Sequence, residues 1–529
     1  MFVRTKPSGR HQYLQIVESR WEDGRPRQHV IATLGRLDRL KVSGQVDAIM
    51  RSLSRFSEKV KVIEGYREGR ISATSVKKVG PELIIGRLWK ELGFPDVLKR
   101  LLGDRRYEFE VERAIYFTVL SRLFFPSSDR KALRISRDYK IEGKDGLKLH
   151  HFYRAMAWLG DMKDEVEEDL FLSNRKLFTG LNLVFFDTTS IYFEGNGGES
   201  LGQYGYSRDN RSDEKQMIVG AVIDTAGRPI SCPMWPGNMA DSRTLVPVVQ
   251  RLKERFGVGE IVIVADRGMV SREAVEELEG LGVGYIFGIK MRKEKEVNTE
   301  VLSRAGKYRE VEDNLKVKEV RLQGRRYIVC LNPEEAERDR AKREVIIESM
   351  RRKLKEGAKA LIGNRGYRRY LKIERASVKI DEEKAKSEER FDGKYVLRTN
   401  TSLSVEEVAL RYKELWQVER IFREVKGVLE TRPVYHKYDS TIKGHVFCSF
   451  LALVIMKELM RRVDFKAEWD EMRQDIDTLY EVEIEHEGKK YLLRSPLQGM
   501  CGKVLKAVGV AVPPSVTETK HSAKTNFDR

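Results

Sequence analysis

Apolar residues recur at every third or fourth position in four stretches between residues 81 and 172, with Gly and Pro punctuating them. This spacing gathers apolar side chains on one side of a helix. It predicts a helical domain at residues 77–178, a candidate for DNA binding although no helix-turn-helix motif stands out. Upstream, residues 12–34 alternate between apolar and polar about Glu22-Asp23-Gly24, which predicts a β-hairpin. The hairpin and a basic linker form the predicted N-terminal unit, residues 1–76.

The pattern changes to that of an α/β core after Leu181. The run LNLVFFDTTSIYF breaks at Asp187, which predicts a central strand that ends or bulges there, followed by a second strand. A third strand, a helix, an apolar run that closes on Asp266 and a further helix come next. This order predicts a mixed sheet covered by helices, with its first part at residues 179–290.

A long interval separates this part of the core from the next candidate acidic residue. Glu419 follows Asp266 by 153 positions, which is too many for a loop without structure of its own. Alternating segments that turn at Gln323-Gly324, followed by a charged helix, predict a β-rich insertion at residues 291–390.

The chain then returns to the core and ends in a small module. A strand that begins near Phe391 opens the second part of the core, predicted at residues 391–460. The C-terminal module, residues 461–529, contains a predicted hairpin about Glu487-Gly488. The polar tail from Pro513 onward is expected to be disordered.

Residues 412–426 predict one amphipathic helix, because the run contains neither Pro nor Gly and carries apolar residues at helical spacing. Tyr412, Glu419 and Lys426 are each seven positions apart and therefore lie nearly in line along it. A carboxylate on a face that should be buried is costly unless it is paired or holds a metal. The alternative is that Glu419 lies at the edge of this face with its carboxylate in solvent.

Asp187 and Asp266 are the natural partners of Glu419, because α/β sheets usually hold ligands at the carboxyl ends of their central strands. Each aspartate alone fits a solvated turn at a strand end equally well. Three carboxylates without a nearby His or Cys favour Mg²⁺ or Mn²⁺ over zinc. The sequence therefore predicts a divalent metal site built from these three residues.

The composition favours an anionic partner. The 529 residues include 99 Lys and Arg against 81 Asp and Glu, a net charge of +18, which points to nucleic acid first and to an anionic membrane second. Four scattered cysteines without a CxxC pair argue against a zinc ribbon or a disulfide framework and fit a reducing cytosol. The first residues lack the apolar core of a secretory signal, and the most apolar run, Val446 to Met456, is too short to span a bilayer.

The acidic residues, with the sequences around them, resemble the triad of DDE insertion-sequence transposases. Asp187 lies in FFDTTS, Asp266 in VADRGM and Glu419 in a Y-x6-E-x6-K frame. The resemblance covers residues 180–460 and extends to the segment WPGNMADSRTL, which contains Asp241, and to the basic polar segment GYSRDNRSDEKQ.

The closest branch of these transposases carries a Tyr-Arg-Glu-Lys signature. Tyr412, Lys426 and the glutamate between them match the signature position by position. Its arginine position is Leu415 here, which is a departure from the pattern. The phosphate contact of that arginine then falls to another residue, such as Arg420 or Arg423, or is absent.

The resemblance implies an RNase H-like catalytic core, interrupted by the β-rich insertion, that performs cut-and-paste transposition of an insertion sequence. Two Mg²⁺ ions, or two Mn²⁺ ions, would activate the attacking oxygen and stabilise the leaving one. Asp187 would bridge both ions, and Asp266 and Glu419 would hold one each. Water would expose a 3′-hydroxyl that attacks the opposite strand to form a hairpin, with Tyr412 and Lys426 on the terminal phosphates. No nucleotide cofactor is needed.

Double-stranded DNA is the implied partner, both as terminal inverted repeats and as target, bound by a homodimer without any membrane association. The implied location is the cytoplasm, in association with the nucleoid. A further candidate surface for nucleic acid interleaves cations with aromatic rings, and a solvated strand is its alternative. Its members are Arg365, Tyr367, Arg368, Arg369, Tyr370 and Lys372. Beyond the helix, Arg432, His436 and Lys443 are also candidate DNA contacts.

Two other functions stay open from the sequence. An RNase H-like DNA nuclease would cut without strand transfer. A non-catalytic, transposase-derived protein would bind DNA only, and the intact acidic residues count against this second alternative.

Overall fold

The computed structural model contains two compact units, and each is considered by itself. Unit 1 consists of Met1–Lys78, Thr478–Gln498 and Val512–Arg529, and unit 2 of Val79–Asp477 and Gly499–Ala511. The residues that the structure describes are 1–22, 25–54, 65–68, 73–178, 181–195, 197–356, 361, 365–374, 377–463, 467–486 and 489–519. In this part of the chain, every helix is too short or too polar to cross a lipid bilayer.

The N-terminal sheet of unit 1 has three antiparallel strands, β1 (Phe2–Ser8), β2 (His11–Glu22) and β3 (Arg25–Arg36). The predicted hairpin corresponds to β2 and β3, while the turn residues Asp23 and Gly24 lie outside the described residues. Two helices follow, α1 (Leu37–Val42) and α2 (Gln45–Ser54).

A second sheet of unit 1 joins segments from both ends of the chain, in the order β19-β18-β17-β4. The predicted C-terminal hairpin is confirmed as β17 and β18, although Glu487-Gly488 lies outside the described residues. The expectation of disorder is wrong for the strand β19, because its backbone pairs with β18 and the side chain of Val516 packs with Ile484 and Tyr491. The strands are β4 (Ala73–Lys78), β17 (Tyr480–His486), β18 (Lys489–Arg494) and β19 (Val516–Thr519).

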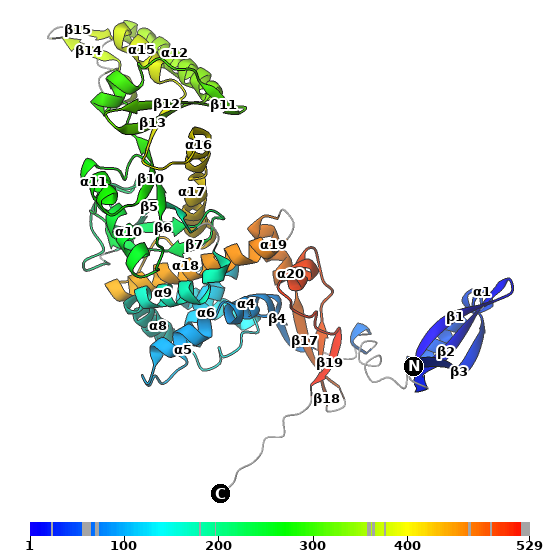
Figure 1. Ribbon diagram of the computed structural model, residues 1–529. Coiled ribbons are helices and arrows are strands. Elements are labelled where there is room, and N and C mark those ends of the chain that lie inside the picture. Colours follow the sequence, from blue (N-terminus) through cyan, green and yellow to red (C-terminus); the bar gives the residue numbers. More distant parts are fainter. Residues whose placement is uncertain are drawn as a thin grey trace. The chain divides into compact units, whose positions relative to one another are not determined.

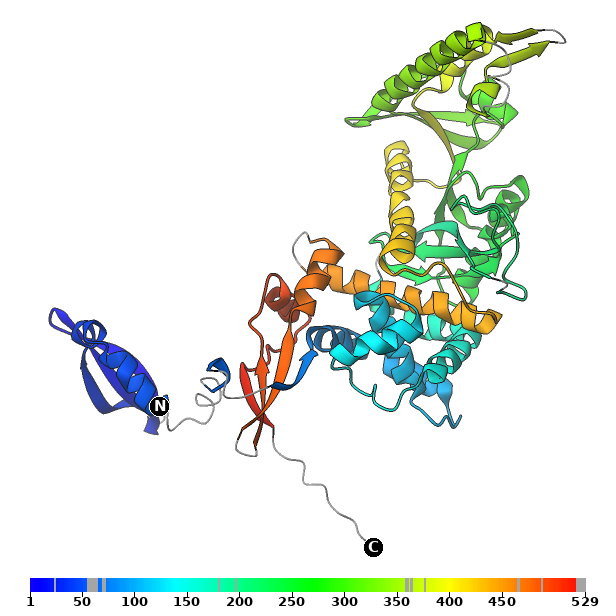
Figure 2. The same cartoon turned by 180° about the vertical axis from the view of Figure 1, so that it is seen from behind.

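Unit 2 opens with the helices predicted from the apolar spacing. The long helix α18 (Asp439–Arg462) packs against two of them, α6 and α8, and both views show it between these helices and the sheet (Figures 1 and 2). A Cβ on Gly160 would lie 1.9 Å from the Ser440 carbonyl oxygen, so the backbones of α8 and α18 touch. The helices of this layer are α4 (Gly80–Glu91), α5 (Phe94–Leu102), α6 (Val111–Phe124), α7 (Asp129–Ile135), α8 (Leu149–Asp161) and α9 (Lys163–Ser173).

A ten-stranded mixed sheet forms the core of unit 2, which confirms the α/β class (Figure 1). Its order is β11-β12-β13-β16-β10-β9-β5-β6-β7, and β8 also pairs with β6. Only the pairs β5–β9 and β9–β10 are parallel. The strands are β5 (Leu183–Tyr192), β6 (Gln216–Ile223), β7 (Pro229–Ser231), β8 (Met234–Pro236), β9 (Val262–Ala265), β10 (Gly284–Ile289), β11 (Arg309–Glu312), β12 (Leu315–Leu322), β13 (Arg325–Leu331) and β16 (Lys394–Thr399).

The strand β5 differs from its prediction, because it runs unbroken through Asp187. Its pairing with β6 continues from Phe185 to Tyr192 without a shift of register. The polar residues after Asp187 therefore remain in the strand, since their backbone groups have partners in β6. The predicted break is wrong.

Residues of the expected insertion extend the core sheet. The hairpin β12–β13 turns at Gln323-Gly324 as predicted, with both residues at positive φ. Its strand β13 pairs with β16, and β16 pairs with β10, so the returning strand joins these strands to the core. The remaining elements of this region are α12 (Pro333–Glu356), α14 (Arg365–Arg368), β14 (Leu371–Glu374), β15 (Ser377–Ile380) and α15 (Glu382–Glu388).

Helices cover the two faces of the sheet. On one face, α10 (Leu245–Glu254) and α11 (Arg272–Gly280) bury their apolar side chains against Val184, Phe186, Ile263 and Ala265. On the other, α16 (Val405–Lys413) packs on β9 and β10, and α17 (Trp416–Arg423) packs on β5 and β6.

Candidate active site

Strand register brings Asp187 and Asp266 to the same level of the sheet. Phe186 lies opposite Ala265 in the parallel pair β5–β9; Asp187 is the next residue of β5, and Asp266 directly follows the last residue of β9. Side chains alternate between the two faces of a sheet. Because Phe186 and Ala265 face α10 and α11, the two aspartates face α16 and α17.

Asp187 is held in an environment that opposes its charge. Its pKa is raised to about 6, first by burial and to a smaller extent by the charges of Asp266 and Asp241. The Arg208 guanidinium, 3.8 Å from Oδ1, and the backbone N–H of Thr188 act in the opposite direction. A carboxyl group crowded by two other acids is one that a bound cation would stabilise in its ionised form.

Tyr412 links the covering helices to Asp266. Its hydroxyl donates a hydrogen bond to Oδ1 of Asp266 at 2.9 Å, and burial together with the Asp266 charge raises the pKa of the phenol. A Cβ on Gly288 would lie 2.3 Å from the Tyr412 oxygen, so only glycine leaves room for this contact. The hydroxyl predicted to contact DNA thus has a protein partner in this structure.

The single helix predicted at residues 412–426 is interrupted. Hydrogen bonds of the 3₁₀ type, from Leu415 N to Tyr412 O and from Val418 N to Leu415 O, separate α16 from α17. A π-helical turn, Glu424–Val428, follows α17. The 3₁₀ turn before α17 and the π turn after it alter the rotation per residue in opposite directions. The apolar positions before and after the break therefore stay buried. The apolar spacing therefore could not reveal the break.

Glu419 faces solvent from α17. Its carboxylate is exposed and, among the described residues, has no hydrogen bond or ion pair. Along the chain it lies midway between Tyr412, bonded to Asp266, and Lys426, whose Nζ lies 3.0 Å from Asp209. The helix is therefore attached near the aspartates on both sides of Glu419.

The three predicted ligands do not form one close cluster. In the described part of the chain, the only three His, Cys, Asp or Glu residues with ligand atoms all within 4.8 Å of one another are Glu108, His150 and His151. That group fits a metal poorly, because Nδ1 of His151 accepts a hydrogen bond from Lys148 N and leaves the proton of the neutral ring on Nε2. Glu108 is also paired with Arg154. The oxygen ligands of Asp187 and Asp266 suit a hard divalent cation better.

Arg208 and Asp241 complete the surroundings of Asp187. Nη2 of Arg208 lies 2.9 Å from Asp241 Oδ2 and 3.0 Å from Thr188 Oγ1. The Thr188 hydroxyl in turn donates to Asp241 Oδ1 at 2.9 Å. Sequence reasoning noted the segments that carry Arg208 and Asp241 but assigned neither residue a role, since nothing in the sequence shows that these loops fold over β5.

A cationic group borders this network. Asp209, the neighbour of Arg208, binds both Lys426 and Arg432, with Nη1 of Arg432 at 2.6 Å. The predicted DNA contact Lys426 is therefore close to the aspartates, although it is half-buried and paired. Arg420 forms an ion pair with Glu424, and Arg423 is exposed without a partner in the described chain.

The second predicted DNA surface lies in the inserted region, on and after α14. Tyr367 bonds through its hydroxyl to Ser349 of α12 at 3.0 Å and packs in the apolar cluster of that helix. Arg369 pairs with Glu388, and Arg368 is exposed. The backbone of Arg365 belongs to α14, but its side chain is outside the described part. Tyr367 therefore presents less of its ring to a base than the interleaved sequence predicts.

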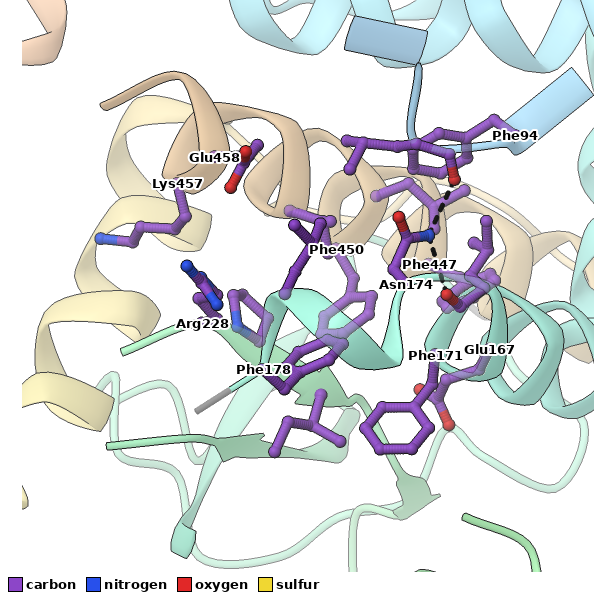
Figure 3. Close-up of a pocket in the computed structure, with 17 residues that line it drawn as sticks. Phe94, Glu167, Phe171, Asn174, Phe178, Arg228, Phe447, Phe450, Lys457 and Glu458 are labelled. Carbon is purple, nitrogen blue, oxygen red and sulfur yellow. Dashed lines mark hydrogen bonds between the residues drawn. The ribbon is translucent and has the colours of Figure 1, made fainter. Parts of the chain in front are cut away.

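An apolar cavity lies apart from these acidic residues (Figure 3). Phenylalanines of α9 and α18, with Phe94 and Phe178, line it beside Arg228. Asn174 at its wall donates to the carbonyl oxygens of Leu92 and Leu170. None of the predicted metal ligands lines this cavity.

Comparisons with known proteins assign the part of the chain that forms the sheet to a family. Residues 179–455, more than half of the chain, match the family described as Transposase DDE domain. Residues 2–68 match the IS1634 family transposase, N-terminal domain. A search of curated proteins finds no match.

Two solved structures show weak likeness. A piggyBac transposase synaptic complex with hairpin DNA gives a TM-score of 0.37 at 9% identity, over 75% of this chain and 78% of that one. A Mos1 transposase paired-end complex with the left transposon end gives 0.15 at 15% identity, over 35% and 61%. Neither likeness is strong enough to support an argument. The family match is sufficient: this chain belongs to the DDE transposases of insertion sequences, and it is a DNA transposase, a phosphoryl transferase that cleaves DNA and transfers its strands.

Proposed function

We propose that Asp187, Asp266 and Glu419 are the metal ligands of this transposase and that its core is RNase H-like. The observation that carries the proposal is the position of the two aspartates, side by side on parallel strands and on the face covered by α17. The strand order β7-β6-β5-β9-β10, with β5 to β7 antiparallel and β9 and β10 parallel to β5, supports the RNase H-like assignment. The helices α10 and α11, which follow β8 and β9, also agree with it.

Two divalent ions, Mg²⁺ or Mn²⁺, would supply activation of the attacking oxygen and stabilisation of the leaving oxygen in an in-line displacement. Asp187 would hold both ions, which is the role that the resemblance to DDE transposases implies for it. Tyr412 keeps Asp266 oriented through its hydroxyl. Glu419 would join the aspartates by a movement of its side chain or of α17, a short helix with non-α turns at both ends. Irregular turns of this kind often occur where helices must adjust at functional sites.

The cations around the site favour double-stranded DNA with its reacting phosphate near Asp187. Lys426, Arg432 and Arg208 lie on one side, and Lys426 is the residue that the Tyr-x6-Glu-x6-Lys frame assigns to the terminal phosphate. We place this chain in the hairpin-forming branch on the strength of that frame. Arg420, Arg423 and the arginines of residues 365–369 are proposed as further backbone contacts. Two copies acting in the cytoplasm on paired inverted repeats complete the proposal.

The decisive experiment compares cleavage and joining of a labelled duplex that carries the inverted repeat of the element. Wild type in Mg²⁺ should nick this duplex, form and reopen a hairpin, and join the released 3′-hydroxyl end to target DNA. Glu419→Ala should abolish all three steps while DNA binding in Ca²⁺ stays within about twofold, since one ligand is lost but the cations remain. Glu277→Gln, on the opposite face of the sheet, is the matched control. Cleavage by Glu419→Ala in Mg²⁺ would contradict the assignment of this ligand.

A further inference from the structure

Arg208 reaches Asp187 from the segment between β5 and β6, not from the covering helix. Its backbone N–H donates to the side chain of Ser190 at 2.9 Å, which ties this part of the segment to β5. Its side chain is 30% exposed, so the guanidinium borders solvent while it touches the acidic group. No other cation of the described chain forms an ion pair with Asp187.

The contacts of Arg208 are unequal in strength. Nη2 makes two hydrogen bonds, to Asp241 and Thr188, at 2.9 and 3.0 Å. Nη1 lies 3.8 Å from Asp187, beyond hydrogen-bond distance, so this contact is an ion pair without a directional bond. Nη1 and Nε have no hydrogen bond within the described residues. One edge of the guanidinium is thus anchored, and the remaining N–H groups are free for another anion.

Asp241 is suited to hold this arginine and not a metal ion. One of its oxygens accepts from Thr188 and the other from Arg208, so both already have donors. A metal ion at Asp241 would have to compete with these two donors, one of which is already a cation.

We propose that Arg208 changes its partner in the active site, from Asp187 in the metal-free protein to a phosphate of bound DNA. Asp241 and Thr188 are the residues that position it. Without metal, it offsets the charge of Asp187. When divalent ions take Asp187, the free N–H groups of Arg208 turn to a phosphate of the bound DNA, for which a planar fork of donors is well shaped. The phosphate would then lie beside Lys426 and Arg432, which bind the adjacent Asp209. The inference rests on the proposed role of Asp187 as a metal ligand.

The first test measures Mn²⁺ binding to the full chain without DNA, by the electron paramagnetic resonance signal of free Mn²⁺. Arg208→Gln should bind Mn²⁺ roughly fivefold or more tightly, because the competing cation is gone. Arg208→Lys keeps the charge and should stay near wild type. Arg211→Gln, in the same segment but paired with Asp213 and Glu214, is the control and should not change. Unchanged or weaker Mn²⁺ binding by a folded Arg208→Gln protein would overturn the inference.

The second test measures binding of the inverted-repeat duplex in Ca²⁺ over a range of salt concentrations. Arg208→Gln should weaken binding and lower the salt dependence by about one phosphate contact. Asp241→Asn should weaken binding less, and adding it to Arg208→Gln should have no further effect, because it acts through the arginine. If the losses of DNA affinity in the two single variants add up in the double variant, Asp241 does not act through Arg208 and its positioning role is wrong.

Failure of the metal assignment can be told apart from failure of this inference. Asp187→Asn should lose most of the Mn²⁺ affinity of the wild type. Wild-type affinity in Asp187→Asn refutes the proposed metal site itself. Loss in Asp187→Asn together with no gain in Arg208→Gln refutes only the role of Arg208.

Discussion

The aspartates and the glutamate of the proposed site are held in different ways. Asp187 and Asp266 follow paired residues of parallel strands, so hydrogen bonds of the sheet determine their separation. Glu419 belongs to a helix of 8 residues with a tight turn before it and a π turn after it, and its exposed carboxylate has no partner in the described chain. In the proposed metal site, the sheet would therefore supply a preformed pair of ligands, whereas the helix would supply one that must approach.

The sharpest test of this difference is metal affinity in the absence of DNA. Asp187→Asn should weaken Mn²⁺ binding by about 100-fold, because the central ligand is lost. Glu419→Gln should weaken it by less than about tenfold, because the glutamate is not yet in place in the free protein. Titration calorimetry measures both. Equal losses would mean that Glu419 is already a ligand before DNA binds and that the helix does not need to move.

A smaller effect should appear in the pH dependence of stability of the metal-free protein. The pKa of Asp187, about 6 in the folded state, exceeds that of an unfolded aspartate, so the folded state holds its proton to higher pH. As the pH rises from about 4 to about 6, the free energy of unfolding should therefore fall, and the contribution of Asp187 to this fall should be about 2 to 3 kcal/mol. Urea unfolding of wild type against Asp187→Asn isolates the contribution. A constant difference between the two proteins across this range would count against it.

One added methyl group can strain the contact between Tyr412 of α16 and Asp266. Gly288→Ala places a Cβ against the Tyr412 oxygen and should cost about 1 to 3 kcal/mol of stability. It should also reduce cleavage, because Asp266 loses its partner. Gly268→Ala, where a Cβ meets nothing within 4 Å, is the matched control. Thermal unfolding separates the two variants, and equal melting temperatures would show that Tyr412 moves aside freely.

The mildest change removes only the hydroxyl of Tyr412. Tyr412→Phe loses one hydrogen bond to a carboxylate and should lower the free energy of unfolding by about 1.5 kcal/mol, with a loss of cleavage larger than the loss of DNA binding. Tyr308→Phe, whose hydroxyl has no hydrogen bond in the described chain, should change neither. If DNA affinity falls most, Tyr412 acts mainly on the phosphate and its bond to Asp266 is incidental.

Much of the fold could be predicted from local patterns. Strands β5 and β9 are apolar runs, and α12 begins and ends within the charged stretch expected to be helical. The break between α16 and α17 could not be predicted, because Leu415, Val418 and the apolar residues after them keep helical spacing across it. The continuity of β5 through Asp187 was also hidden, since the pairing partner that sustains it is another part of the chain.

Local patterns were enough to predict the apolar strand that carries Asp187, the apolar strand that leads to Asp266 and the helical residues around Glu419, and the composition shows that the chain is basic enough to bind DNA. The packing of distant segments places Arg208 beside Asp187, bonds Tyr412 to Asp266 and leaves Glu419 exposed. The physical reason is the separation along the chain of the residues that interact. The patterns that predict strands and helices depend on neighbouring residues. The contacts of the site join segments that are up to 146 residues apart along the chain, and they depend on how the sheet and its covering helices pack.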